Sequence, residues 1–428
     1  MSIPVYNSLA RYLEKRPSFH LDDYVAERES VCEILAAVRQ RGDAALKELT
    51  ARYDGVAPAE LRVGEAEMEA AAEAVEPSLV EALRSAKENI ENFHRRQVPS
   101  SWWESGPGYL VGQRRRPLRS VGAYIPGGTA SYPSSVLMTV LPAQVAGVKE
   151  IYLCTPPAAD GSIPALTLLA AREAGATAVF KVGGAQAVAA LAYGTETVPA
   201  VSKIVGPGNL YVTLAKRELY GRVGIDLLAG PSEIVVVADA EANPAYIAAD
   251  LLSQAEHDIL ARPLLITTSA DLVRQVEREL QEQLRNLPRM EIAGRSLEEQ
   301  GAVLLVSTLE EAWRAVNDLA PEHLELQVAD PWRYLDAIEN AGAIFIGSDT
   351  PEPVGDYWAG SNHVLPTGGT ARYASPLGVD NFMKSTHLLY YSAAALAGAA
   401  PQIEKLARAE GLEGHARAVA IRRQNDGT

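Results

Sequence analysis

From about residue 120 onward, short apolar runs alternate with helical patterns, and this alternation constrains the fold more than any other feature of the sequence. The runs that we predict to be strands are Val121–Ile125, Ile151–Cys154, Val179–Val182, Ile204–Val205, Ile234–Val237, Leu264–Thr267, Val303–Val306, Leu324–Val328 and Ile344–Ile346. The early runs are about 25–30 residues apart, a spacing typical of βαβ units with right-handed crossovers. Two successive series of this kind predict two α/β domains with parallel sheets.

The flanking segments have a helical pattern instead. Near the start of the chain, apolar residues recur with helical spacing at Val31, Ile34, Leu35 and Val38. A longer helical pattern runs from about Glu65 to Arg96, and Pro77 is expected to divide it because proline lacks the backbone donor that a helix interior needs. After about residue 380 the pattern is helical again.

Charge argues against nucleic acid or an anionic membrane as the main partner. The 428 residues include 39 Lys and Arg against 54 Asp and Glu, a formal net charge of −15, and no basic run exceeds Arg114–Arg116. No stretch approaches the roughly 18 uninterrupted apolar residues of a membrane span. The first residues lack the apolar core of a signal peptide. We therefore expect no membrane association.

The two cysteines, Cys32 and Cys154, have neither a metal-binding nor a redox spacing. Read as structural thiols, they are consistent with a reducing cytoplasm, which is the location that we expect. Two cysteines cannot form a cysteine-rich zinc site. Any metal in this protein must therefore be bound mainly by nitrogen and oxygen ligands.

Four glycine-rich segments stand at candidate strand ends: residues 126–128, 183–186, 206–209 and 230–233. Glycine allows backbone N–H groups to approach a phosphate or a sugar, and ligands of open α/β sheets bind beyond the carboxyl ends of strands. One such segment is weak evidence because glycine turns are common, but four together predict a ligand crevice. Neither G-x-G-x-x-G nor G-x-x-x-x-G-K-[ST] occurs, which disfavours a standard Rossmann phosphate turn and a P-loop.

Two segments combine histidine with other polar groups at the ends of expected elements. Gln254 and His257 are three residues apart at the end of a predicted helix, so both can bind one ion; a solvated helix end is the alternative. Glu322 and His323 are adjacent at the start of a predicted strand. A carboxylate beside an imidazole can take two proton-transfer roles near neutral pH; a solvated turn is the alternative.

Two further pairs are weaker candidates. Asp356 and His363 lie seven residues apart in what we expect to be a constrained loop, with a solvated surface loop as the alternative. Glu410 and His415 lie in the helical tail, where an exposed helix end is the alternative. Taken alone, neither pair identifies a function.

Together these segments resemble the histidinol dehydrogenase family from about residue 105 to the tail, with the motifs in order. The first hundred residues add little beyond their helical character. The segments that carry the resemblance are Val121–Gly128, Val182–Ala187, Gly206–Asn209, Ala229–Glu233, Ser253–His257, Pro321–Leu324 and Ser361–Thr367.

The resemblance implies oxidation of L-histidinol to L-histidine through the aldehyde, with two NAD⁺ and one zinc ion per subunit. The general acid/base pair would be Glu322 and His323. The implied zinc ligands are Gln254, His257, Asp356 and His415. The implied substrate contacts are Ser232, Gln254, His257, His323, Asp356, His363, Glu410 and His415. The implied NAD contacts are Tyr124, Gln186 and Asn209.

The resemblance also implies a fold of two incomplete Rossmann-like α/β domains with small helical N- and C-terminal segments. It explains the missing glycine fingerprint. The expected division is an N-terminal segment 1–24, a discontinuous main domain 25–123 and 234–378, an inserted domain 124–233, and a tail 379–428 that reaches the partner in an intertwined homodimer. Active sites would then be shared between subunits.

Three other functions remain open from the residues. A zinc hydrolase fits the His, Asp and Glu residues but leaves four glycine-rich segments without a ligand. A non-catalytic two-lobed solute-binding protein is disfavoured by the missing signal peptide and by the adjacent Glu322 and His323. A paralogue acting on another small polar alcohol, such as a sulfonated propanediol, is the nearest alternative, and His363, Glu410 and His415 favour histidinol over it.

Overall fold

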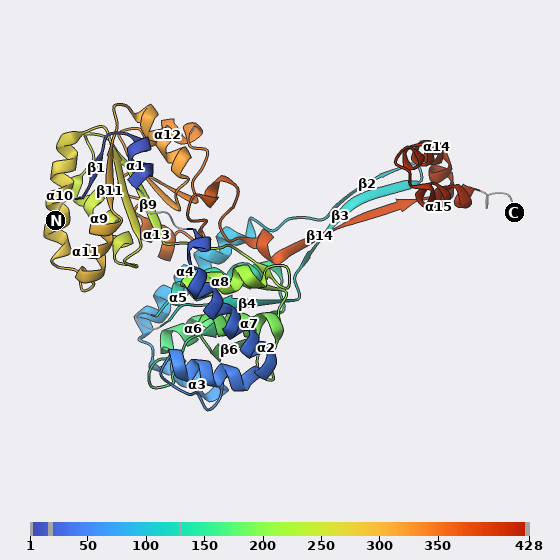
Figure 1. The fold of residues 1–428 in the computed structure, drawn as a ribbon, viewed down its shortest axis with the longest axis horizontal. Coiled ribbons are helices and arrows are strands. Elements are labelled where there is room, and N and C mark those ends of the chain that lie inside the picture. The colour runs from blue at the N-terminus through green and yellow to red at the C-terminus, as the bar shows by residue number, and fades with distance from the viewer. Residues whose placement is uncertain (1–2, 16–19, 128–130, 424–428) are drawn as a thin grey trace. The chain divides into compact units, whose positions relative to one another are not determined.

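The computed structural model describes residues 3–15, 20–127 and 131–423. By its internal contacts the chain divides into two units. The first comprises Met1–Gln97 and Arg119–Phe382, and the second comprises Val98–Leu118 and Met383–Thr428. Figure 1 shows that the first unit contains two separate sheets, each flanked by helices.

One sheet of the first unit has five parallel strands in the order β6-β5-β4-β7-β8. The strands are β4 (Ser120–Tyr124), β5 (Glu150–Thr155), β6 (Ala178–Lys181), β7 (Lys203–Val205) and β8 (Gly224–Ile225). The chain starts in the middle at β4, moves outward to β6 and then returns to β7 on the other side of β4. This reversal creates a switch point between β4 and β7, where ligands of open α/β sheets bind.

Helices cover both faces of this sheet. They are α2 (Val25–Tyr53), α3 (Glu65–Ala74), α4 (Pro77–Arg95), α5 (Pro133–Ala146), α6 (Ala165–Ala174), α7 (Gly184–Tyr193) and α8 (Leu210–Leu219). Buried residues of α2, such as Val31 and Leu46, pack with Val188 of α7 and Leu214 of α8 in one apolar cluster. The five-stranded half therefore includes residues that precede the expected inserted domain. The expected domain boundaries themselves stay a prediction.

The other sheet of the first unit has six parallel strands in the order β1-β11-β10-β9-β12-β13. The strands are β1 (Val5–Tyr6), β9 (Glu233–Ala238), β10 (Arg262–Thr267), β11 (Ala302–Leu305), β12 (His323–Gln327) and β13 (Ala343–Ile346). The neighbouring helices are α1 (Leu9–Lys15), α9 (Pro244–Ala255), α10 (Ala270–Leu284), α11 (Met290–Glu299), α12 (Leu309–Leu319) and α13 (Glu352–Tyr357). Every residue of β9 is buried, which is typical of a parallel strand covered on both faces.

The predicted strands and the α/β class are confirmed. Each of the nine apolar runs is a strand whose ends lie within two residues of the prediction. Pro77 begins α4 and separates it from α3, as expected. The expectation that all four glycine-rich segments follow strands is wrong for residues 230–233, because that segment leads into β9 instead. The strands β1 and β8 were not predicted, since two residues are too few for a periodic pattern.

The second unit consists of an antiparallel sheet and two helices. Its strands are β2 (Trp102–Gly106), β3 (Tyr109–Pro117) and β14 (Met383–Tyr391), in the order β14-β3-β2, followed by α14 (Ala393–Ala409) and α15 (Glu413–Arg423). The expectation of a purely helical tail is therefore wrong for residues 383–391. Most of β14 is exposed and its partner β3 is far away in the sequence, so no buried periodicity marks it as a strand.

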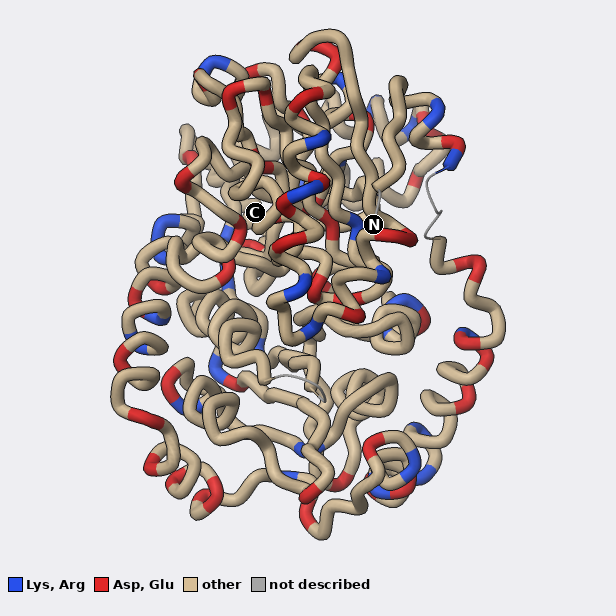
Figure 2. The backbone as a smooth tube through the Cα atoms, turned by 90° about the vertical axis from the view of Figure 1, so that its left-hand side faces the viewer, with Lys and Arg blue, Asp and Glu red and all other residues tan. Residues whose placement is uncertain are grey.

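Within the described ranges, no helix is long and apolar enough to cross a membrane. Figure 2 shows acidic and basic residues interspersed along the backbone that faces the viewer. Short 3-10 helices complete the described secondary structure at Leu21–Asp23, Pro331–Ala337, Thr370–Arg372 and Val379–Phe382.

Candidate active site

Glu322 and His323 lie in the interior at the amino end of β12, beside the amino end of β9. The two residues are 6% and 4% exposed. Glu322 Oε2 accepts a hydrogen bond from the backbone N–H of Glu233 at 2.8 Å. His323 Nδ1 lies 2.9 Å from the Glu233 carbonyl oxygen. Because a carbonyl can only accept, Nδ1 carries a hydrogen, and when the ring is neutral its Nε2 presents the lone pair. The backbone of β9 thus orients both side chains.

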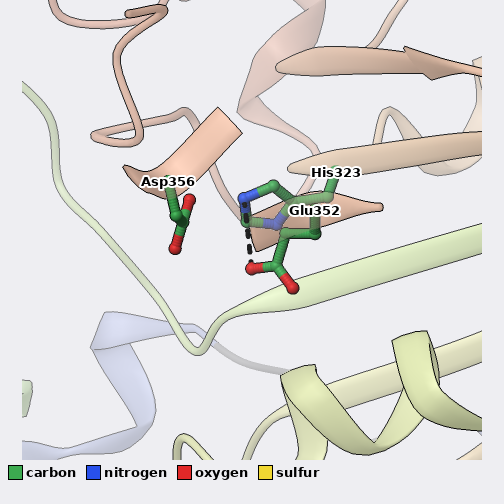
Figure 3. Close-up of side chains that lie close together, drawn as sticks. All are labelled: His323, Glu352 and Asp356. Carbon is green, nitrogen blue, oxygen red and sulfur yellow. Dashed lines mark ion pairs between the residues drawn. The ribbon is translucent and has the colours of Figure 1, made fainter. Parts of the chain in front are cut away.

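Helix α13 adds two carboxylates to this pair. Glu352 Oε1 is 3.8 Å from His323 Nε2, and Glu352 Oε2 accepts a hydrogen bond from Ser253 Oγ at 3.0 Å. One helical turn later, Asp356 offers a carboxylate on the same side. Atoms of His323, Glu352 and Asp356 lie within 4.8 Å of one another, a spacing that allows them to bind one metal ion, and Figure 3 shows the three side chains converging.

Two of these placements differ from the sequence analysis. Asp356 was expected in a loop but lies in the short helix α13. Glu352 was not predicted as a site residue. Glu352 lies four residues before Asp356, and in a helix this spacing places the two carboxylates on one face. The spacing could therefore have identified Glu352, but only if the segment had been predicted as a helix and not as a loop.

A buried polar network holds α13 in place. Glu325, two residues after His323 in β12, accepts a hydrogen bond from the backbone N–H of Glu352 at 2.9 Å. Gln327 donates to Asp250 at 2.6 Å and to Glu325 at 3.1 Å. Burial, together with the neighbouring Asp250, raises the pKa of Glu325 to about 9. The first turn of α13 is therefore tied directly to the strand that carries His323.

The end of α9 provides a group that the protein leaves unsatisfied. Gln254 is 1% exposed, and within the described part of the chain neither its Nε2 nor its Oε1 has a hydrogen-bond partner. An unpaired buried amide is costly, so this side chain points to a bound ligand or ion. His257 follows three residues later and is exposed. Its charge acts on both Glu352 and His363, which places it in the same neighbourhood.

His363 and Ser232 complete the residues that surround the pair in this unit. His363 Nδ1 is 3.8 Å from Asp356 Oδ1, and its Nε2 lies 3.3 Å from Ser135 Oγ. Burial lowers the pKa of His363 and thereby favours its neutral form, while Asp356 opposes this effect. Ser232 directly precedes β9, next to Glu233. Its backbone carbonyl accepts a hydrogen bond from the Arg262 N–H at 2.9 Å.

Burial and charge shift the proton affinities of the pair. Burial raises the pKa of Glu322 to about 8, with His323 opposing the shift. Burial also disfavours the charged form of His323, but Glu322, Glu352 and Asp356 outweigh it and raise the pKa of His323 to about 9. Carboxyl groups concentrated in this way attract a cation or a protonated amine. A group whose pKa lies near the working pH can both accept and release a proton, which is what general acid/base catalysis requires.

The other predicted residues of the first unit lie at the carboxyl edge of the five-stranded sheet. Tyr124 ends β4, and its hydroxyl accepts a hydrogen bond from the Gly184 N–H at 3.1 Å, at the start of α7. Gln186 is 2% exposed in the first turn of α7. Asn209 precedes α8 and accepts a hydrogen bond from the Val212 N–H at 3.2 Å. These residues flank the switch point, where a dinucleotide would be expected.

The remaining two predicted residues lie in the second unit. Glu410 follows the last residue of α14, and His415 lies in α15. Both side chains are exposed. The structure therefore brings together the predicted residues of the first unit around Glu322 and His323 or around the β4–β7 switch point, and it describes Glu410 and His415 separately from them.

Comparison with known proteins gives a consistent result. The family model described as histidinol dehydrogenase matches residues 18–423. A histidinol dehydrogenase of Moorella thermoacetica is 58% identical over 397 residues, covering 92% of this chain and 94% of the relative. One from Halalkalibacterium halodurans is 54% identical, covering 94% of this chain and 95% of the relative. The crystal structure of histidinol dehydrogenase from Elizabethkingia anophelis superposes with a TM-score of 0.92 at 37% identity, covering 100% of this chain and 99% of that one.

Proposed function

Because this chain belongs to the histidinol dehydrogenase family, we propose that it oxidises L-histidinol to L-histidine through the aldehyde, with two NAD⁺ and one zinc ion per subunit. Family membership makes it an oxidoreductase that acts on histidinol in histidine biosynthesis. The observation that carries the finer proposal is the buried pair of Glu322 and His323, in which the Glu233 backbone fixes both side chains.

His323 acts as the base in both oxidations. Its Nδ1 is committed to the Glu233 carbonyl, so the alcohol proton is accepted by Nε2, the atom that faces Glu352. In the first oxidation the substrate loses a proton from oxygen to His323 and a hydride from carbon. In the second it loses the same pair from the hydrated aldehyde. Glu352 lies where its carboxylate stabilises the imidazolium that forms each time.

Glu322 acts between the two oxidations. Its carboxylate takes a proton from a water molecule as the water oxygen bonds to the aldehyde carbon, and this addition gives the hydrated aldehyde. The Glu233 N–H holds one carboxylate oxygen, so the other oxygen is available for the water proton. The two adjacent residues thus divide the work, with Glu322 activating water and His323 serving both hydride transfers.

Zinc would be held by Gln254, His257 and Asp356 together with His415 of the partner subunit. Of the cluster of His323, Glu352 and Asp356, only Asp356 would bind it, because His323 Nε2 serves as the base and Glu352 faces that atom. Bound there, the ion would supply a fixed positive charge that orients the amine and the imidazole nitrogen of the substrate. The unsatisfied amide of Gln254 fits this role, because its oxygen and nitrogen otherwise remain buried without partners in the described chain. Ser232, His363 and Glu410 of the partner subunit would complete the substrate contacts.

NAD⁺ would occupy the carboxyl edge of the five-stranded sheet and accept a hydride in each oxidation. Tyr124, Gln186 and Asn209 would contact it. Support comes from the strand order, which opens a switch point between β4 and β7 at the position of these residues. Residues 226–233 connect that edge to the catalytic pair. At one end of this segment Asp226 contacts Gly206, and at the other end Glu233 begins β9 beside Glu322 and His323.

The second unit supports the proposal of a homodimer with shared active sites. Its three-stranded sheet exposes large apolar side chains: Trp102, Trp103, Leu389, Tyr390 and Tyr391 are between 45% and 74% exposed. A patch of this kind is typical of an interface. A second copy of the chain is the occupant that we propose, because the tail also carries Glu410 and His415, whose exposed side chains the proposed site requires. We further propose that the enzyme works in the cytoplasm.

The function is tested with purified, zinc-loaded protein by following NADH formation. L-Histidinol should be oxidised far faster than other small polar alcohols, including a sulfonated propanediol. Chelation of zinc should abolish the activity while the circular dichroism spectrum stays the same, because the large apolar cores do not depend on the metal. Preference for another alcohol, or full activity without zinc, would contradict the proposal.

A further inference from the structure

A buried ion pair lies behind the glycine-rich segment that follows β7. Lys216 of α8 and Asp226, just after β8, are 2.6 Å apart between Nζ and Oδ1. Their side chains are only 4% and 1% exposed. Removing two charges from water is costly unless their remaining hydrogen-bonding capacity is also used. The groups that accept or donate the remaining hydrogen bonds of Lys216 and Asp226 therefore indicate the role of the pair.

Both members of the pair bind the same glycine. Lys216 Nζ donates a hydrogen bond to the carbonyl oxygen of Gly206 at 2.6 Å. The backbone N–H of Gly206 donates to Asp226 Oδ2 at 2.7 Å. Together with the ion pair, these contacts form a closed ring around Gly206. We call Lys216 and Asp226 the loop clamp.

The clamped backbone is one that only glycine readily adopts. Gly206 has a φ of 110°, and a Cβ atom at this position would lie 2.1 Å from the carbonyl oxygen of Tyr124. The segment is therefore pressed against the end of β4. Three residues later, Asn209 caps α8, the helix that also carries Lys216. The loop clamp thus fixes residues 206–209 between β4 and α8, at the switch point of the sheet.

We propose that Lys216 and Asp226 are positioning residues for the dinucleotide, which hold the Gly206–Asn209 segment in its binding conformation without touching NAD or histidinol themselves. This inference rests on the proposed use of NAD. It predicts a specific consequence: loss of the clamp weakens dinucleotide binding and leaves histidinol binding unchanged, because the catalytic pair is positioned by β9 and β12 instead.

Three variants test the proposal: Asp226→Asn, Lys216→Met and the double variant. Asp226→Asn keeps an acceptor for the Gly206 N–H but removes the charge opposite Lys216. A single variant that leaves one charge buried alone can unfold the protein, and the double variant avoids this because it removes both charges at similar volume. Arg84→Met is the control. Arg84 forms a 2.7 Å ion pair with Glu173 between α4 and α6, and neither residue adjoins the glycine-rich segments.

Each variant is prepared as the zinc-loaded protein. NADH affinity is measured by fluorescence titration, histidinol affinity by calorimetry, and the fold by circular dichroism and thermal unfolding. We expect the dissociation constant for NADH to rise about tenfold or more in Asp226→Asn and in the double variant, the scale of one lost hydrogen bond to a charged group. Histidinol affinity should stay at the wild-type value, and Arg84→Met should change neither affinity.

Two results would overturn the proposal. Wild-type NADH affinity in the folded double variant would mean that the clamp does not position the segment. Equal losses of NADH and histidinol affinity, together with a lower unfolding temperature, would mean that the pair has only a general structural role. Failure of the wild-type protein to bind NADH would instead contradict the proposed function itself, so the two failures are distinguishable.

Discussion

Replacing Glu322 by glutamine is expected to slow oxidation of the aldehyde far more than oxidation of the alcohol. The amide keeps the volume of the side chain, and its oxygen can still accept the hydrogen bond that the Glu233 N–H donates over 2.8 Å. The fold around β12 should therefore persist. What is lost is the carboxylate that takes the proton from water. One positioned general base contributes about 10²–10⁴-fold, so aldehyde oxidation should fall by a factor in that range.

Alcohol oxidation should be affected less. Glu322 Oε2 lies 3.7 Å from His323 Nδ1. Burial lowers the pKa of His323, and Glu322 is the strongest of the charges that raise it again. Removing that charge makes His323 a weaker base without removing it. A lower pKa weakens His323 as a base but leaves a larger fraction of it unprotonated near neutral pH, so we expect alcohol oxidation to lose far less than aldehyde oxidation.

The assay supplies L-histidinol and its aldehyde separately and follows NADH formation with excess NAD⁺. His323→Asn should damage both half-reactions, because His323 serves both hydride transfers. Glu173→Gln is the control: this carboxylate pairs with Arg84 at 2.7 Å, away from the site, and its loss should change neither rate. Equal losses in both half-reactions of Glu322→Gln would refute the division of roles between Glu322 and His323.

The remaining predictions concern pH, metal and subunits. The rate of alcohol oxidation should rise with pH through the range of about 8 to 9, because His323 must lose its proton before it can accept another and its pKa is raised to about 9; a pH–rate profile that is flat above pH 6.5 would contradict this. Gln254→Ala should lower zinc affinity at least about tenfold while the unfolding temperature of the metal-free protein does not fall, since its amide has no partner in the described chain; unchanged zinc content after dialysis would remove Gln254 from the ligand set. Mixing His323→Asn subunits with His415→Ala subunits should recover roughly a quarter of wild-type activity, because about half of the dimers then carry one intact site; no recovery after confirmed subunit exchange would exclude a shared site.

The framework of this fold could be predicted from the sequence because its central strands are buried on both faces. Strand β9 is a continuous apolar run, and such a run needs no knowledge of its neighbours to be identified. The opposite case is β14, whose side chains are largely exposed and whose partner β3 lies far away in the sequence. Its pairing is a tertiary property, so local periodicity predicted a helix there.

The site shows the same limit. Glu322 and His323 are adjacent in the sequence, so their joint chemistry could be predicted. Glu352 could not, because its role depends on a six-residue helix that is held by Glu325 and Ser253 from two other elements. The loop clamp likewise depends on contacts that close only in the folded chain, since Lys216 and Asp226 meet across Gly206.

The stoichiometry of the reaction tests the central claim most directly. A limiting, known amount of L-histidinol is incubated to completion with zinc-loaded protein and excess NAD⁺, and both NADH and L-histidine are quantified. The side-by-side placement of Glu322 and His323 predicts two NADH and one L-histidine for each L-histidinol, with no free aldehyde remaining. One NADH for each L-histidinol, with aldehyde accumulating, would contradict the account.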